Sequence, residues 1–324
     1  MSLDNGFSPP KALEASRKLV EELGVLAEVG TLGTPTNVAI QKYLNGKRVP
    51  QLYVAAGASR FNDPKNYPWT VPFYTRFEME ARVFGKFILQ TKPDAKIAVL
   101  YQNDDFGKDY LDGVKKTLGA KAATMIVAEA SYELADPTVD TQIIAFNASG
   151  ADTLLEFATP KFAALAIRKT YDLGWRPLQI VGQPGSSIES VLRPAGVEKA
   201  VGLHTAQLLK DPGDPIFAND PEVIDYAEFM KTWAPDDNAQ DTGAIVGYVV
   251  AQGVELALRR CGDELTRDNL LKQATTLDGL RLKMLLPGML LYNSPDNYAA
   301  FHQYQLARFD GSTWVLLGEL ITAD

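Results

Sequence analysis

The sequence predicts an α/β protein in which mostly parallel sheets are flanked by helices. Short apolar strands alternate with helices of about 10–15 residues over the first two thirds of the chain, and this alternation is typical of parallel sheets. The 324 residues are enough for two domains of about 100–200 residues each. Hydrophobic residues make up 46% and charged residues 22% of the chain, which excludes a disordered chain and a coiled-coil rod.

Local signals place the elements of this alternating part. Ser8 predicts a helix N-cap, because Pro9 and Pro10 follow it in the first turn, and Gly24 ends that helix. Apolar runs predict strands over 27–29, 51–55, 96–101, 124–128, 153–157 and 178–182. A second helix is expected between the turn at 30–37 and Pro50. Further helices are expected over 78–89, 109–118, 138–148 and 161–173, and residues 182–187 open another.

The last third of the chain is organised differently. The helices expected there run over 221–233, 242–260 and 266–276. A hairpin closes the chain, with strands over 303–309 and 313–320 around an Asp-Gly turn, the strongest short signal for a hairpin. His204 and His302 are both expected in strands, where a structural role is favoured because neither has a nearby partner in sequence.

Composition argues against several classes of function. Lys plus Arg is 32 and Asp plus Glu is 40, and a net charge of −8 does not suit general binding of nucleic acid, which needs a basic face. The single Cys261 excludes an internal disulfide and a Cys-based zinc site, and we expect it to be inert core. No uncharged apolar stretch approaches the roughly 18–20 residues of a membrane helix, so we expect no direct membrane insertion.

Common enzyme motifs are also missing from the sequence. It contains no Gly-x-Gly-x-x-Gly after a strand, no phosphate-binding loop, no Gly-x-Ser-x-Gly and no His-Glu-x-x-His. Asp104 and Asp105 follow a strand and could imitate a magnesium or phosphoacceptor site, but an Asp that caps the next helix is favoured. We therefore expect no catalytic residues, no metal and no cofactor.

Function is expected in the loops after strands, because ligands of open α/β sheets bind beyond the carboxyl ends of the strands. Four such loops are small, polar and rich in Gly: 31–37, 56–59, 103–107 and 183–187. Gly and Ala let a ligand approach the backbone, and a helix N-terminus offers free N–H groups to a carboxylate. Thr34 and Thr36 suit a turn and a carboxylate site equally well.

Several segments, in a set order and spacing, carry a resemblance that covers nearly the whole chain. They are Asp4-Asn5-Gly6-Phe7-Ser8-Pro9, Gly30-Thr31-Leu32-Gly33-Thr34-Pro35-Thr36, Val49-Pro50-Gln51, 101–110, 158–162 and Arg308-Phe309-Asp310-Gly311. Together they resemble the leucine/isoleucine/valine-binding type of solute-binding protein that serves ABC importers. That family has the type I periplasmic binding fold.

One departure from the family concerns the N-terminus. In the family the Asp-x-x-x-x-Pro segment follows the second strand of the first lobe, whereas here it begins at Asp4. We therefore expect this chain to lack the usual first strand, first helix and export signal. The sheet of the first lobe should then have an uncovered edge.

The resemblance implies two lobes joined by three hinge crossings, with a ligand cleft between them that closes by a hinge motion. Lobe one is expected at 1–73 and 206–299, and lobe two at 74–205 and 300–324. Thr34 is the implied hydroxyl for the ligand carboxylate, and Phe106 is the implied aromatic wall where many relatives have Tyr. The full set of candidate ligand-binding residues is Thr34, Thr36, Ala56, Gly57, Ala58, Phe106, Thr159 and Pro184.

The ligand class is left open by one position. Relatives that bind amino acids place an acidic residue near Pro184, but residues 182–187 contain no Asp or Glu, and Glu189 is already one turn into the expected helix. Burying an ammonium group without a carboxylate costs several kcal/mol. A branched-chain amino acid and an aromatic or aliphatic acid without an amino group are therefore both candidate ligands.

The function implied by the resemblance is that of a non-catalytic, extracytoplasmic binding protein. It would deliver a small carboxylate-bearing ligand to the membrane permease of an ABC importer, and its natural location would be the periplasm. A ligand-sensing receptor or regulator domain of the same fold is the alternative, and an α/β enzyme is a weaker one.

Overall fold

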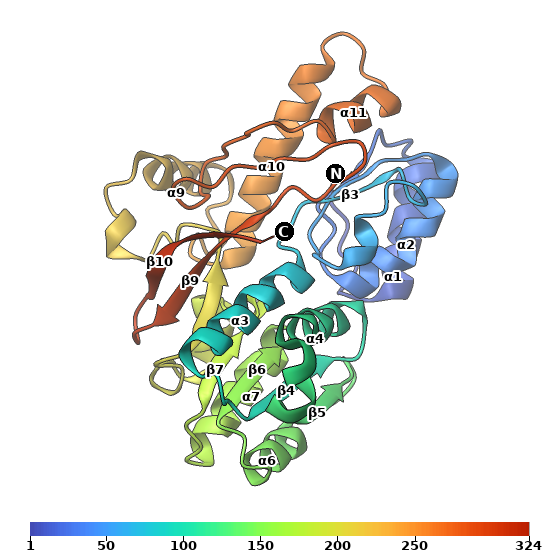
Figure 1. The fold of residues 1–324 in the computed structure, drawn as a ribbon. Helices are drawn as coiled ribbons and strands as arrows, with labels where there is room; N and C mark the ends of the chain where they lie inside the picture. The colour runs from blue at the N-terminus through green and yellow to red at the C-terminus, as the bar shows by residue number, and fades with distance from the viewer. Residues whose placement is uncertain (324) are drawn as a thin grey trace. The chain divides into compact units, whose positions relative to one another are not determined.

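Two β-sheets organise residues 1–323, which the computed structural model describes (Figure 1). Unit 1 comprises Met1–Arg76, Val246–Leu282 and Leu290–His302, and unit 2 comprises Phe77–Ile245, Lys283–Met289 and the chain from Gln303 onward. Residues 206–245, which the sequence assigns to lobe one, thus belong to unit 2. The lobe boundaries and the three hinge crossings stay a prediction, and Asp324 lies outside the described residues.

Unit 1 contains a parallel sheet of three strands in the order β1-β2-β3. Its strands are β1 (Glu28–Val29), β2 (Gln51–Val54) and β3 (Thr70–Pro72), and its helices are α1 (Pro9–Arg17), continued by a π-helical turn over Lys18–Glu22, α2 (Thr34–Lys47), α11 (Arg267–Ala274) and most of α10 (Thr242–Cys261). Ala12 of α1 packs on Ile40 and Leu44 of α2. As expected, β1 is an edge strand, and the side chain of Val29 is exposed there.

Unit 2 contains a sheet of seven strands in the order β10-β9-β8-β7-β6-β4-β5. Its strands are β4 (Ile97–Gln102), β5 (Ile126–Tyr132), β6 (Thr153–Phe157), β7 (Leu178–Val181), β8 (His204–Gln207), β9 (Gln303–Phe309) and β10 (Trp314–Thr322). Neighbours from β4 to β8 run parallel, whereas β9 and β10 form the antiparallel hairpin that the sequence predicts. The α/β fold class is therefore confirmed.

The helices of unit 2 are α3 (Phe77–Thr91), α4 (Asp105–Leu118), α5 (Ala122–Met125), α6 (Asp140–Ala148), α7 (Pro160–Asp172), α8 (Arg193–Ala195) and α9 (Pro221–Trp233). Gly113 lets α4 approach α3, because a Cβ at that position would lie 2.3 Å from the carbonyl oxygen of Glu78. The close approach supports a stack in which Tyr110 lies between Phe77 and Phe157, with ring centroids 5.1 and 4.4 Å away.

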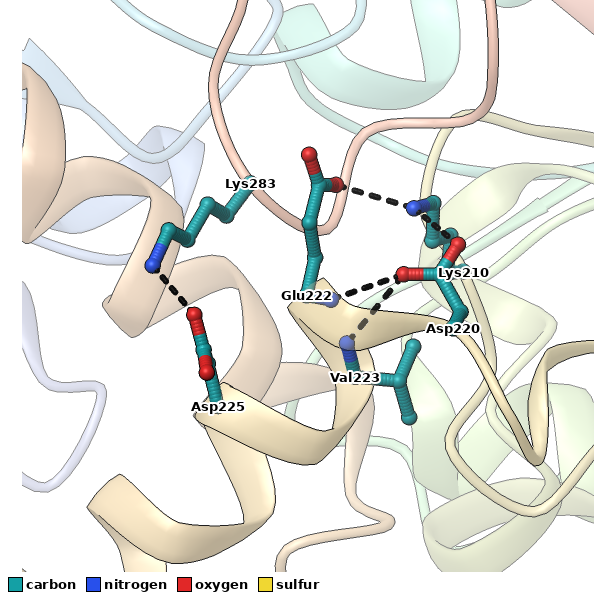
Figure 2. A network of polar contacts seen from close by, with 6 residues as sticks. All are labelled: Lys210, Asp220, Glu222, Val223, Asp225 and Lys283. Carbon is teal, nitrogen blue, oxygen red and sulfur yellow. Dashed lines mark hydrogen bonds and ion pairs between the residues drawn. The ribbon is translucent and has the colours of Figure 1, made fainter.

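A buried lysine fixes the start of α9 (Figure 2). The Nζ atom of Lys210 lies 2.6 Å from Asp220 Oδ2 and 2.9 Å from Glu222 Oε2, and the residue is 1% exposed. Asp220 also caps α9, since its Oδ1 accepts from the backbone N–H groups of Glu222 and Val223. Removing Asp220 or Glu222 would leave the buried charge of Lys210 with one partner fewer, which is costly inside a protein.

The structure differs from the sequence-based expectations at several places. Strand β5 begins at Ile126 and not at 124, because the Ala-rich stretch before it forms the short helix α5. The helix expected to open from residues 182–187 is present: after a 3₁₀ turn over Gln183–Gly185, Ser187 caps a π-helical turn over Ile188–Leu192 that continues into α8. Strand β3 has only three residues and was not foreseen. His302 precedes β9, and its Nε2 lies 3.0 Å from the carbonyl oxygen of Ala299.

Glu156 is an acidic side chain inside the seven-stranded sheet. It lies on β6, is fully buried, and its Oε1 accepts a hydrogen bond from Gln179 Nε2 on β7. Its Oε2 has no hydrogen-bond partner within residues 1–323. Burial raises the pKa of Glu156 to about 8, although the bond from Gln179 opposes the rise. The folded protein therefore keeps this carboxyl protonated at neutral pH.

We expect Glu156→Gln to stabilise the protein at pH 8 by up to a few kcal/mol, and the gain to shrink toward pH 5. The unfolded carboxyl loses its proton near its ordinary pKa of 4.5, whereas the folded one keeps it up to about pH 8. Glu156 therefore does not reduce the stability of the wild type below about pH 4.5, and the stability falls as the pH rises from 4.5 to about 8. Urea unfolding at both pH values measures the difference, with exposed Glu319→Gln as control. An equal gain at both pH values would contradict the account.

Candidate ligand-binding site

One group of candidate residues lies at the corner of unit 1 where α2 begins. Leu32 pairs with Ala55, and the Gly33 N–H donates to the carbonyl oxygen of Ala55 at 3.2 Å. Gly33 has φ +92° and ψ 146°, and α2 starts at the next residue, Thr34. Residues 56–58 follow Ala55 directly and are buried, so the structure brings them beside Gly33 and Thr34.

A chain of buried amides fixes this corner. Asn37 Nδ2 donates to the carbonyl oxygens of Thr31 and Gly33, at 2.7 Å each. Asn37 Oδ1 accepts from Gln51 Nε2 at 2.9 Å, and Gln51 Oε1 accepts from the hydroxyl of Thr70 at 2.9 Å. The polar groups of these three side chains all have hydrogen-bond partners. Together they fix the start of α2 to β2 and β3 in one conformation.

The two candidate threonines of this corner differ in their partners. The Thr36 hydroxyl donates to the carbonyl oxygens of Leu32 and Gly33, so it supports the turn. Thr34 is 3% exposed, and its Oγ1 has no hydrogen-bond partner within residues 1–323. A buried hydroxyl without a partner costs about 1–3 kcal/mol. At the N-terminus of the 14-residue helix α2, it is well suited to donate to an anion together with the free N–H groups of the first turn.

A second group of candidate residues lies in unit 2, at the carboxyl ends of neighbouring parallel strands. Phe106 follows β4, Thr159 follows β6 and Pro184 follows β7, so the structure gathers these three along one edge of the sheet. Phe106 is 3% exposed, and its ring packs edge-on against Phe77 at 4.9 Å between centroids. Asp104 is the N-cap of α4, as predicted: its Oδ1 accepts from the Phe106 and Gly107 N–H groups.

Thr159 is held by a network that begins with Tyr132, the last residue of β5. The Thr159 N–H donates to the Tyr132 hydroxyl at 2.9 Å, and that hydroxyl donates to Gln102 Oε1 at 3.1 Å. Burial raises the pKa of Tyr132, so its phenol stays protonated and can make both bonds. Gln102 Nε2 in turn donates to Asp104 Oδ2 at 2.7 Å. The ends of β4, β5 and β6 are thus fixed to one another.

Glu80 is a buried carboxylate that reasoning from the sequence missed. Its Oε1 accepts from the Gln183 N–H at 2.8 Å and its Oε2 accepts from the Tyr110 hydroxyl at 2.7 Å. It therefore links α3 to the turn that carries Pro184. The one signal in the sequence is helical spacing, since residue 80 shares the apolar face of α3 with Phe77 and Phe84. The other nearby acid, Glu189, is paired with Arg193 at 2.6 Å.

Comparison with known families decides what kind of protein carries these two groups of candidate residues. A family model described as periplasmic binding protein matches residues 1–313. The chain belongs to this family. The resemblance seen in the sequence is thereby confirmed. No protein among the curated sequences matches this periplasmic binding protein.

Solved structures share its fold, that of the type I periplasmic binding proteins. A substrate-binding periplasmic protein from Ralstonia solanacearum is 21% identical with a TM-score of 0.84, and the match covers 97% of this chain and 86% of that one. A branched-chain amino acid ABC transporter protein from Thermus thermophilus with bound valine is 13% identical with a TM-score of 0.83, covering 99% and 84%. A possible leucine/isoleucine/valine-binding protein from Rhodopirellula baltica SH 1 is 18% identical with a TM-score of 0.82, covering 98% and 84%.

A membrane-spanning helix and a metal-binding cluster are both absent from the described residues of this periplasmic binding protein. None of the helices within residues 1–323 is long and apolar enough to span a membrane. Over the same residues, no group of three or more His, Cys, Asp or Glu side chains is arranged to hold a metal ion.

We expect Tyr132→Phe to lower the free energy of unfolding by about 1–3 kcal/mol, because the buried Gln102 Oε1 loses a donor and the half-buried Thr159 N–H loses its acceptor. Thermal unfolding measures the change. Tyr101→Phe is the matched control, since the Tyr101 hydroxyl makes no hydrogen bond within residues 1–323 and its loss should be nearly neutral. Equal melting temperatures for wild type and Tyr132→Phe would contradict the network.

Proposed function

We propose that this periplasmic binding protein captures a small carboxylate-bearing ligand outside the cytoplasm and delivers it to the membrane permease of an ABC importer. The observation that carries the proposal is the buried hydroxyl of Thr34, which has no partner within residues 1–323, at the N-terminus of α2. The ligand carboxylate would accept from this hydroxyl and from the free N–H groups of the first helical turn. Family membership supports a binding role over catalysis.

The other candidate residues would complete the ligand's surroundings. Ala56, Gly57 and Ala58 have little or no side chain, so the ligand could lie against their backbone. Phe106, Thr159 and Pro184 would meet the ligand from the second lobe when a hinge motion closes the cleft. The Thr36 hydroxyl would act indirectly, since its bonds to the backbone hold the turn that presents Thr34.

For the ligand class, we favour a carboxylate without an ammonium group. The Thermus relative holds valine, whose ammonium needs a carboxylate partner when it is buried. In this chain the turn at Pro184 carries no acidic residue, the oxygens of Glu80 already accept bonds inside the protein, and Glu189 is paired with Arg193. Aromatic and branched aliphatic acids satisfy the carboxylate site without this cost.

A thermal-shift screen with benzoate-type acids, branched aliphatic acids, valine, leucine and the amides of the acids tests the ligand class. An acid that binds should stabilise the protein by about 2.7 kcal/mol at a hundredfold excess over its dissociation constant. We expect stabilisation by one class of acid and none by the corresponding amides. Stabilisation by valine or leucine alone would overturn the preferred ligand class while leaving the binding role intact. Equal stabilisation by acid and amide would contradict the carboxylate site.

The hydroxyl of Thr34 is tested with Thr34→Val, which keeps the shape of the side chain. We expect the affinity for the acid to fall about 10- to 100-fold, because a bond to a charged group contributes about 1.5–3 kcal/mol. The melting temperature of the free protein should not fall, since the hydroxyl has no partner to lose. Thr36→Val is the matched control: it removes two bonds to the backbone and should lower the melting temperature. Titration calorimetry showing unchanged affinity for Thr34→Val would refute the assignment.

A further inference from the structure

The aromatic ring of Phe7 occupies the space beside the Cα atom of Gly33. A Cβ atom built on Gly33 would lie 2.2 Å from Phe7 Cε2 and 2.6 Å from Phe7 Cζ. Real Cβ atoms do not approach other atoms so closely, so the ring can lie there only because position 33 is glycine. The two residues therefore fit each other, although the first lies before α1 and the second is the N-cap of α2.

The backbone conformation of the loop before α1 places this ring beside Gly33. Phe7 has φ +56°, in the left-handed region that non-glycine residues rarely adopt, and Gly6 before it has φ +54°. Two side chains of the same loop hold this conformation: Asp4 Oδ1 accepts from the Gly6 N–H at 2.7 Å, and Asn5 Oδ1 accepts from the Phe7 N–H at 2.9 Å. Such a conformation is strained for a residue other than glycine, so the surrounding contacts must compensate for it.

Gly33 is thus restrained from two directions. Its carbonyl oxygen accepts from Asn37 Nδ2 at 2.7 Å and from the Thr36 hydroxyl at 2.9 Å. Its Cα atom is covered by the ring of Phe7. A glycine has more conformational freedom than any other residue, and this one stands immediately before Thr34. Without the ring, part of that freedom would return and would have to be lost again when a ligand binds.

We propose that Phe7 is a positioning residue for ligand binding, which acts by immobilising Gly33 and so presenting the Thr34 hydroxyl in its binding geometry. The inference rests on the proposed function of Thr34. Phe7 does not have to touch the ligand. Its effect on affinity passes through Thr34, so the contribution of Phe7 should disappear when the hydroxyl of Thr34 is absent.

A double-mutant cycle on the full chain tests this route, with calorimetric titration of the acid that gives the largest thermal shift. We expect Phe7→Ala to weaken binding about tenfold in the wild type and to have little further effect in Thr34→Val, since residues that act as one unit are not additive. Phe7→Tyr, which keeps the ring, should bind like wild type. Fully additive effects of Phe7→Ala and Thr34→Val would overturn the proposal.

The variant Leu13→Ala distinguishes a positioning role of Phe7 from a general loss of stability. Leu13 lies on α1 and packs against the cluster between α1 and α2, so this variant should lower the melting temperature without changing the affinity. A loss of affinity in Leu13→Ala as large as in Phe7→Ala would show that Phe7 acts only through stability, and would overturn its positioning role.

Hydrogen exchange of the free protein distinguishes failure of this inference from failure of the proposed function. The Gly33 N–H donates to Ala55 and the Asn37 N–H donates to Gly33, so both amides report on the corner. We expect Phe7→Ala to speed their exchange about tenfold and Leu13→Ala to leave it near wild type. If no tested acid binds but the two amides exchange faster in Phe7→Ala, the proposed ligand class is wrong, whereas the immobilisation of Gly33 by Phe7 is supported. Unchanged exchange in Phe7→Ala overturns the inference whatever binds.

Discussion

The side-chain amide of Asn37 is the contact on which the corner of unit 1 depends. It donates to the carbonyl oxygens of Thr31 and Gly33 and accepts from Gln51, so one side chain joins the start of α2 to the neighbouring strand β2. Buried amides are costly unless every donor and acceptor is used, and here the bonds continue through Thr70 to Asn45. The turn before α2 therefore has one geometry, while the Thr34 hydroxyl has no hydrogen-bond partner within residues 1–323.

The same principle operates at the strand ends of unit 2. Gln102, Tyr132 and Thr159 come from the ends of β4 and β5 and the loop after β6, and their hydrogen bonds fix those ends together. Glu80 does the same for the turn after β7 from the side of α3. In both units, rigid polar networks lie directly behind the small, Gly-rich loops. Pre-organised loops bind more tightly because less conformational freedom is lost when the ligand arrives.

The sequence could predict features that local chemistry determines. The α/β class, the bounds of α9, β6 and β9, and the capping role of Asp104 follow from periodicity and N-cap preference, and all are confirmed. The candidate role of Thr34 came from its position after a strand and from the resemblance, and it stays a prediction with a physical reason to test it.

The sequence could not predict features that depend on contacts between distant segments. Glu80 and Gln183 are 103 positions apart, and nothing near either residue marks the other. The fit between Phe7 and Gly33 has the same origin, because it requires the loop before α1 and the start of α2 to meet. The 3₁₀ turn after β7 has a related origin, because it includes Gln183, whose N–H donates to Glu80.

A crystal structure of the complex with a tight-binding acid would show whether the Thr34 hydroxyl binds the carboxylate of the ligand. We expect a carboxylate oxygen about 2.5–3.0 Å from Thr34 Oγ1, with the free N–H groups of the first turn of α2 facing the same carboxylate. A ligand whose carboxylate lies elsewhere, with Thr34 Oγ1 still lacking a partner, would contradict this expectation.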